Sequence, residues 1–155
     1  MYIYTDGACS GKTNIGGWGI CYSVSDKIVK RKGATMNTTN NRMELQAIIE
    51  AMNEYMAYFS SNSVLVIFSD SAYAIGGCTE WMKKWKKNGW KNAKGEPVKN
   101  ADLWEIISAR IYELKVNKNV EVKFQKVAGH SGNIMNEIAD KLAVSAREEM
   151  ELLWA

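Results

Sequence analysis

Four acidic residues stand at positions where carboxylates can do chemistry. Asp6 and Asp70 each follow an apolar run that predicts a strand, and ligands of α/β proteins usually bind at the carboxyl ends of parallel strands. Glu44 opens a helical pattern and Asp140 lies within another, although aspartate is a mediocre helix former. If the four converge, their mutual repulsion requires cations, and oxygen ligands favour Mg²⁺ or Mn²⁺ over zinc. Two such ions about 4 Å apart can activate a water and stabilise the leaving oxygen of a phosphodiester.

Each of these acids also has a purely structural interpretation. Asp6 precedes a glycine, and this is a common turn pair. Asp70 can cap the helix that follows it, and Glu44 can be a first-turn acid that the helix dipole favours. Asp140 can be a solvated acid beside the lysine that follows it. The spacing alone leaves both interpretations open.

His130 is the only histidine of the chain and lies between the last predicted strand and the last predicted helix. A lone histidine is usually structural or merely exposed. Gly129 and Gly132 flank it, which favours a loop over a packed core position. A titratable imidazole on a loop near a metal site is suited to proton transfer to or from a leaving group.

The elements that must position these residues follow from the hydrophobic pattern. Strands are predicted at residues 2–8, 18–24, 28–36, 64–68 and 120–127, with a hairpin turn near residues 25–27. Helices are predicted from Asn41, from about Ser71, over residues 101–114 and from about Asn133. Thr38, Thr39 or Asn40 can cap the first helix, and the unbroken apolar run at residues 64–68 is typical of a strand buried on both faces. This order predicts an α/β fold with a five-stranded mixed sheet, an antiparallel meander followed by helical crossovers.

The charge of the chain is unevenly distributed. Residues 81–100 contain seven lysines and one glutamate, a net charge of +6, so the rest of a chain whose total is +3 carries −3. A basic segment on a mildly acidic body indicates that one element meets a polyanion while the carboxylates do something else.

Composition excludes several classes of protein. With 46% hydrophobic and 24% charged residues the chain is typical of a globular domain, and its 155 residues suit one domain. The apolar runs are far shorter than the roughly 20 residues of a membrane span, and the N-terminus lacks the pattern of a secretory signal. Three widely spaced cysteines, Cys9, Cys21 and Cys78, predict reduced thiols. We therefore expect a cytoplasmic monomer without a membrane segment or an obligate protein partner.

Several short motifs together resemble a known family. They are Thr5-Asp6-Gly7, Asn40-Asn41-Arg42-Met43-Glu44-Leu45, Ser69-Asp70-Ser71, Gly129-His130-Ser131-Gly132 and Asn136-Glu137-Ile138-Ala139-Asp140. In order and spacing they resemble the type 1 ribonucleases H, over roughly residues 2–146. The segment from Trp81 to Lys91 is similar to the basic protrusion of the bacterial members, and residues 97–104 resemble the stretch after it. The whole chain, residues 1–155, is thus expected to be one catalytic domain with a protrusion at about residues 81–100.

The resemblance implies a ribonuclease H-like fold and a reaction. Asp6, Glu44, Asp70 and Asp140 would bind two Mg²⁺ ions, with Mn²⁺ as a substitute, and His130 would assist proton transfer or product release. The reaction would be endonucleolytic hydrolysis of the RNA strand of an RNA–DNA hybrid, leaving 5′-phosphate and 3′-hydroxyl ends.

The resemblance also implies how the hybrid is held. Asn40 and Asn41 would read 2′-hydroxyls, the backbone groups that distinguish RNA from DNA, although either alone can be a helix cap. Thr39 and Asn100 match positions that grip a DNA phosphate, and Trp81 matches one that packs on a DNA sugar. The remaining residues expected at the substrate are lysines: Lys12, Lys83, Lys84, Lys86 and Lys87.

Two positions depart from the pattern of the bacterial members. Two tryptophans, in contrast, are expected to have a structural role. Lys12 stands where an asparagine that contacts the hybrid is common, so it would offer a phosphate contact instead. Ala72 stands where a glutamine is common. Trp85 and Trp90 recur at nearly helical spacing after Trp81, which predicts internal packing.

Two alternative functions fit parts of the sequence. One is a DNA-directed nuclease or strand-transferase relative on the same fold, which the asparagine pair at residues 40–41 and the histidine loop fit less well. The other is a non-catalytic hybrid- or duplex-binding module that uses only the lysine segment. A pure binder gains nothing from four acids that face phosphate, so the sequence favours the nuclease.

Overall fold

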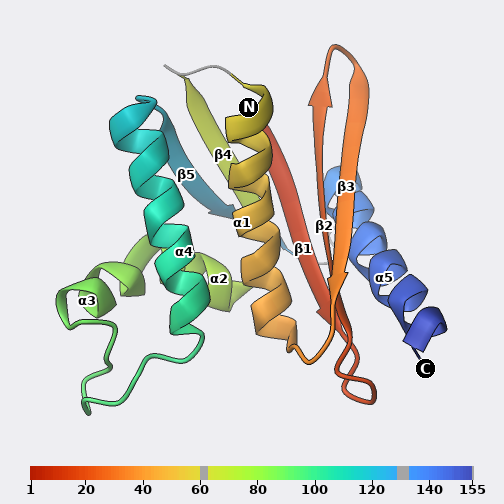
Figure 1. The fold of residues 1–155 in the computed structure, drawn as a ribbon. Helices are drawn as coiled ribbons and strands as arrows, with labels where there is room; N and C mark the ends of the chain where they lie inside the picture. Colours follow the sequence, from red (N-terminus) through yellow and green to blue (C-terminus); the bar gives the residue numbers. More distant parts are fainter. Residues whose placement is uncertain (60–62, 129–132, 155) are drawn as a thin grey trace.

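The computed structural model describes residues 1–59, 63–128 and 133–154. Its elements in chain order are β1 (Tyr2–Cys9), β2 (Gly16–Val24), β3 (Lys27–Thr35), α1 (Asn40–Tyr58), β4 (Val64–Ser69), α2 (Ala72–Gly76), η1 (Gly77–Trp81), α3 (Met82–Lys87), α4 (Ala101–Tyr112), η2 (Glu113–Asn117), β5 (Glu121–Lys126) and α5 (Ile134–Trp154). The two η elements are single π-helical turns. Figure 1 shows their arrangement around one sheet.

The five strands form one mixed sheet in the order β3-β2-β1-β4-β5. β1, β2 and β3 pair antiparallel, whereas β4 joins β1 and β5 joins β4 in parallel. β2 and β3 are joined by Ser25 and Asp26, both with positive φ, as a two-residue hairpin that follows the twist of its strands requires. The predicted α/β fold, meander and crossovers are confirmed.

Helices cover the two faces of the sheet unequally. α1 and α4 lie together on one face, and α5 packs on β1, β2 and β3 from the other (Figure 1). The core lies mainly under α1, where side chains such as Leu45, Ile48 and Met52 are buried against Ile3 and Ile67. The first face is therefore closed by two helices, while the second is closed only over the meander.

This asymmetry corrects one prediction. β4 is not buried on both faces: Leu65, Ile67 and Ser69 are buried, but Val64 is exposed and Val66 and Phe68 are half-buried. The reason is that α5 packs on the meander strands and not over β4. Phe68 instead stacks on Tyr4, with ring centroids 4.4 Å apart.

The helices begin within one residue of the predicted starts. Thr39 is the cap of α1, because its side chain accepts a hydrogen bond from the backbone N–H of Arg42. Ser71 caps α2 through the N–H of Ala74, so capping is not the role of Asp70. The predicted helix over residues 101–114 is α4, which continues directly into η2.

Two further predictions from composition concern the cysteines and membrane-spanning helices. Cys9, Cys21 and Cys78 are free thiols. In the described ranges no helix combines the length and apolarity that a membrane crossing requires.

Candidate functional site

Three of the four predicted carboxylates meet at one end of the sheet. Asp6 lies in β1, Asp70 directly follows β4, and Glu44 lies in the second turn of α1. Asp6, Glu44 and Asp70 each offer a carboxylate oxygen within 4.8 Å of the others. β1 and β4 are parallel neighbours, so their polypeptides carry both aspartates to the same edge. The sequence prediction that these acids converge is confirmed for this triplet.

Gly7 is what allows α1 to reach β1 at this point. A Cβ atom on Gly7 would lie 2.4 Å from the backbone N of Glu44 and from the backbone C of Met43, a clash that backbone atoms do not relieve. Its N–H donates to Asp6 Oδ1 at 2.9 Å and also to Glu44 Oε1. One glycine thus permits the close approach and orients two carboxylates.

Asp140 approaches the triplet from the opposite face of the sheet. It lies in the second turn of α5, which packs closely on β2: a Cβ on Gly19 would lie 2.5 Å from the carbonyl oxygen of Ala139. Gly19 pairs with Asp6 across the sheet, so this contact brings Asp140 beside Asp6. Asp140 lies outside the tight triplet, as a half-buried fourth acid at its edge.

Burial gives these carboxylates unusual proton affinities. Asp6 and Glu44 are each only 5% exposed. Burial raises the pKa of both carboxyl groups, and the pKa of Glu44 is raised further by the neighbouring Asp6 and Asp70. Asp70 and the contact with Asp140 also raise the pKa of Asp6, against the lowering effect of hydrogen bonds from its partners. Such a cluster holds protons at neutral pH unless cations compensate its charge.

The chemistry of the donor set fits a hard divalent cation. The triplet offers only carboxylate oxygens, and Asp140 adds another carboxylate at its edge. All-oxygen ligands from carboxylates suit Mg²⁺ and Mn²⁺, whereas structural zinc sites are built from cysteine and histidine. His130 lies outside the described residues.

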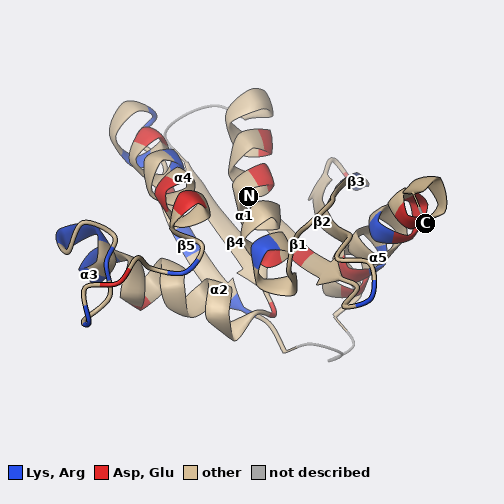
Figure 2. Ribbon diagram, turned by 60° about the horizontal axis from the view of Figure 1, so that its bottom comes forward, with Lys and Arg blue, Asp and Glu red and all other residues tan. Residues whose placement is uncertain are grey.

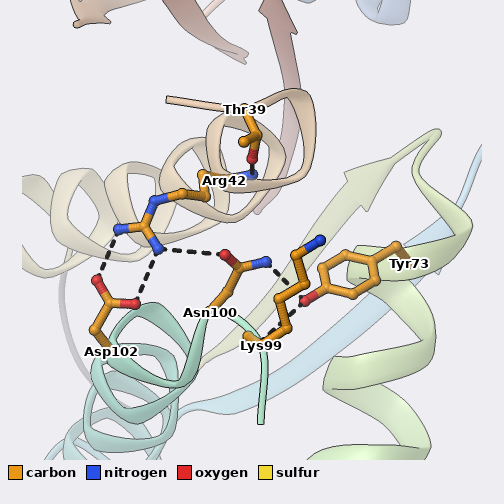
Figure 3. Close-up of polar contacts among 6 residues, drawn as sticks. All are labelled: Thr39, Arg42, Tyr73, Lys99, Asn100 and Asp102. Atoms are coloured by element: carbon orange, nitrogen blue, oxygen red, sulfur yellow. Dashed lines mark hydrogen bonds and ion pairs between the residues drawn. The ribbon is translucent and has the colours of Figure 1, made fainter. Parts of the chain in front are cut away.

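A second polar cluster joins the starts of α1 and α4 (Figure 3). Arg42 donates to both carboxylate oxygens of Asp102, at 2.9 and 2.7 Å, and to Asn100 Oδ1 at 3.3 Å. Asn100 donates through Nδ2 to the hydroxyl of Tyr73 at 3.0 Å. Since Thr39 caps the helix of Arg42, the cluster brings together both residues predicted to grip a DNA phosphate.

The other residues predicted to contact the hybrid around these helix ends are exposed. Asn40 and Asn41 are exposed in the first turn of α1, about one turn before the buried Glu44. Lys12 is exposed in the turn between β1 and β2. Capping falls to Thr39, so the side chains of Asn40 and Asn41 are not used as the cap.

The basic protrusion consists of α3 and the loop that follows it to residue 100. Lys83, Lys84, Lys86 and Lys87 are all exposed on α3, and Figure 2 shows this helix as a concentration of basic residues at one end of the molecule. Trp81 is 39% exposed, which leaves part of its ring accessible.

Aromatic packing holds the protrusion to the domain. Trp85 packs against Trp104 of α4, with centroids 5.4 Å apart, and against Trp81 at 6.0 Å. Trp90 is half-buried against the core, and its carbonyl accepts from the N–H of Val98. The predicted internal packing of Trp85 and Trp90 is confirmed.

Comparison with known proteins decides the family. The family model described as RNase H matches residues 1–148. The chain is 42% identical over 151 residues to the ribonuclease H of Ruthia magnifica subsp. Calyptogena magnifica, covering 97% of each. It is 41% identical over 150 residues to the ribonuclease H of Dichelobacter nodosus, covering 96% of this chain and 92% of the relative.

The chain belongs to the RNase H family. It is an endonuclease that hydrolyses the RNA strand of RNA–DNA hybrids. The family is metal-dependent, in agreement with the acidic cluster. This membership favours the nuclease over the non-catalytic binding module that the lysine segment alone would also fit.

Solved structures of RNase H proteins share the fold. LC9-RNase H1, described as a type 1 RNase H with the type 2 active-site motif, is similar with a TM-score of 0.76 and 31% identity, over 96% of this chain and 72% of that one. A foamy viral protease–reverse transcriptase in complex with RNA/DNA hybrid is similar in fold, with a TM-score of 0.80 and 22% identity over 96% of this chain and 20% of that one. The predicted ribonuclease H-like fold is confirmed.

Two residues of this RNase H site were not singled out by sequence reasoning. Gly7 belonged to a common turn pair, and nothing in the sequence indicates that a helix backbone will press against it. Arg42 lies in the Asn40–Leu45 motif, in which Asn40, Asn41 and Glu44 were the candidate residues. It gave no sequence signal of its own, because its partner Asp102 is 60 residues away.

Proposed function

We propose that Asp6, Glu44, Asp70 and Asp140 hold two divalent ions, Mg²⁺ or Mn²⁺, at the end of β1 and β4. The observation that carries this proposal is the triplet of carboxylates within 4.8 Å of one another. Like charges gathered in a buried place are unfavourable without a counter-charge. Cations bound there would also remove the repulsion between this site and the phosphates of a nucleic acid.

The chemistry that such ions supply is activation of a water and stabilisation of charge on the leaving 3′ oxygen of a phosphodiester. The protein positions the carboxylates that would hold these ions. The N–H of Gly7 fixes Asp6 and Glu44, and the rigid pairing of β1 with β4 fixes Asp70 relative to them. Hydrolysis would leave a 5′-phosphate and a 3′-hydroxyl. His130 would take or give the proton of the leaving group.

The hybrid would lie across the starts of α1 and α4 and reach the protrusion. Asn40 and Asn41 are exposed at the start of the helix that carries Glu44 and would contact 2′-hydroxyls of the RNA strand. Thr39 and Asn100, joined through Arg42, would hold a phosphate of the DNA strand.

The protrusion would extend the contact with the DNA strand. Trp81 would pack on a sugar through its exposed face. The lysines Lys83, Lys84, Lys86 and Lys87 would supply the attraction to phosphates, and Lys12 would add a phosphate contact from the turn between β1 and β2.

We further propose that residues 1–155 act as one catalytic domain with its protrusion at about residues 81–100. We expect a cytoplasmic monomer that needs no obligate protein partner. Size-exclusion chromatography with light scattering tests the monomer directly.

A cleavage assay tests the function and its metal requirement together. An RNA–DNA hybrid labelled on the RNA 5′ end is incubated with and without Mg²⁺ or Mn²⁺, beside RNA and DNA duplexes of the same sequence. We expect cleavage of the RNA strand of the hybrid only when a divalent ion is present, with 3′-hydroxyl ends. Cleavage that persists in EDTA, or equal cutting of the DNA duplex, would contradict the proposal.

A further inference from the structure

A cavity of about 600 Å³ lies away from the carboxylate site, between the protrusion, α4 with η2, and the sheet edge. Apolar side chains of several elements line it, among them Met82 of α3, Ile111 of α4, and Val122 and Phe124 of β5. At its rim Tyr112 and Val116 are exposed by 57% and 59%. Exposed apolar side chains that gather around a concave surface usually mark an interaction site.

Four lysines surround this apolar lining. They are Lys83 and Lys86 of α3, Lys115 of η2 and Lys123 of β5, and all four are exposed. None of the described residues that line the cavity is acidic. Lys123 forms an exposed ion pair with Glu121 at 3.7 Å, and such a pair neutralises little. The cavity therefore combines an apolar interior with a strongly positive rim.

The cavity runs along a free strand edge. β5 is the last strand of the sheet, and β4 is its one sheet neighbour among the described strands. Residues 122–125 all line the cavity, although successive side chains of a strand point to opposite faces. A cavity that touches both kinds of side chain must follow the edge of β5, where backbone N–H and C=O groups can pair with another strand.

We propose that this cavity, the β5-edge cavity, binds an extended acidic segment of a partner protein. The segment would pair with the edge of β5, its apolar side chains would enter the cavity, and its aspartates or glutamates would meet the four lysines. Strand addition of this kind draws affinity from backbone hydrogen bonds and specificity from pockets for alternate side chains.

The chemistry of the lining favours a peptide over a nucleic acid. A nucleobase carries several polar edge groups, which lose their hydrogen bonds in an interior of Met82, Ile111, Val122 and Phe124. Unpaired polar groups cost free energy on burial, whereas leucine or phenylalanine side chains gain it. The cavity is thus distinct in chemistry from the face that binds the hybrid, although α3 contributes lysines to both.

A binding experiment with charge-reversed variants tests this proposal. The probe is a short fluorescein-labelled peptide that alternates aspartate with leucine or phenylalanine, titrated with the full chain and followed by anisotropy. The Lys115→Glu/Lys123→Glu variant should weaken binding at least tenfold. Neither residue belongs to the proposed hybrid-binding set, so cleavage of the hybrid should stay unchanged and reports folding independently. The matched control is Lys27→Glu/Lys30→Glu on β3, which should bind the peptide as the natural chain does.

Two further readouts distinguish the possible results. Backbone amide NMR shifts on adding the peptide should centre on residues 122–125. An Ile111→Asp variant should lose peptide binding while cleaving hybrid normally. The proposal is overturned if the peptide does not bind, if both charge-reversed variants bind it equally, or if single-stranded RNA or anionic lipid vesicles occupy the cavity in preference to the peptide.

Discussion

The carboxylate site and the basic protrusion hold their charges in opposite ways. Asp6 and Glu44 are almost fully buried and fixed by backbone contacts, whereas the lysines of α3 extend into solvent from a frame of packed tryptophans. Buried charge is sensitive to protons and to bound cations, because water cannot screen it. Exposed charge is sensitive to salt, because ions screen it readily. pH and salt should therefore separate the two regions experimentally.

The largest effect should come from removing one charge of the carboxylate site. Asp70→Asn keeps the shape of the side chain but removes a negative charge from the triplet. The loss of several kcal/mol of transition-state stabilisation corresponds to at least about 10³-fold in turnover. Hybrid binding should be unchanged or tighter, because one repulsive charge is gone. Single-turnover cleavage and hybrid anisotropy measure the two effects separately.

The matched control for this change is Asp102→Asn, an acid that lies outside the triplet in the cluster of Figure 3. It should retain most of its turnover. If Asp70→Asn retains activity comparable to this control, the assignment of Asp70 as a metal ligand is wrong.

The convergence of the acids was predictable in part, and the reason lies in the sheet. Asp70 directly follows β4, as its apolar run predicts, whereas β1 continues past Asp6 to Cys9. The parallel register that pairs Tyr4 with Phe68 is what brings Asp6 level with Asp70. The position of Glu44 depends on how closely α1 approaches β1, which only the absence of a side chain at Gly7 decides. Asp140 depends on the packing of a helix from the other face. Such contacts between distant segments leave no periodic signal in the sequence.

The second prediction uses the raised pKa of Glu44 and concerns stability. In the metal-free protein the folded state holds a proton on Glu44 at pH values where the unfolded chain, with a pKa near 4.5, has lost it. This contribution is fully present below about pH 4.5 and is lost progressively as the pH rises to about 10, the pKa of Glu44 in the folded protein. At pH 8 the folded chain therefore bears the cost of keeping the buried Glu44 protonated. Glu44→Gln has no such proton to bind, so it should raise the unfolding free energy in EDTA at pH 8 by about 1–3 kcal/mol.

Thermal unfolding with and without Mg²⁺ checks this sign. Each kcal/mol should shift Tm by about 2–4 °C for a domain of this size. Mg²⁺ should stabilise the natural chain more than Glu44→Gln, because the variant has lost a ligand. Glu105→Gln, a change of an exposed acid on α4, is the control and should be neutral. A Glu44→Gln variant that is less stable than the natural chain in EDTA would contradict the buried-charge argument.

The orientation of the lysines shows where sequence periodicity fails. The spacing predicts a basic segment but not which side each lysine faces. η1 inserts a π-helical turn between α2 and α3, and a π turn shifts the helical phase of everything after it. As a result Lys83 and Lys86 line the β5-edge cavity while Lys84 and Lys87 do not. The pair that faces away from the cavity is then the better candidate for the hybrid.

The third prediction compares these two pairs of lysines in the protrusion. Replacing all four of Lys83, Lys84, Lys86 and Lys87 by alanine should raise KM and flatten its salt dependence, since each lost phosphate contact reduces the log–log slope by about 0.7–0.9. Lys84→Ala/Lys87→Ala should produce more of this change than Lys83→Ala/Lys86→Ala. KM measured across a salt series tests both statements, and kcat at saturating hybrid should be nearly constant. An unchanged slope in the fourfold variant would show that the protrusion does not meet the substrate.

The smallest effect should come from Arg42, which connects the two regions. Its guanidinium holds Asp102 with two hydrogen bonds and Asn100 with a third, so it fixes the amide expected to hold a DNA phosphate. Arg42→Lys keeps the charge but cannot form the same planar fork. The loss of about 1 kcal/mol should raise KM several-fold, with kcat unchanged. Arg31→Lys, at the surface pair with Glu54, is the matched control and should not change KM. A fall in kcat at constant KM would instead mean that Arg42 acts on the carboxylates rather than on the grip of the hybrid.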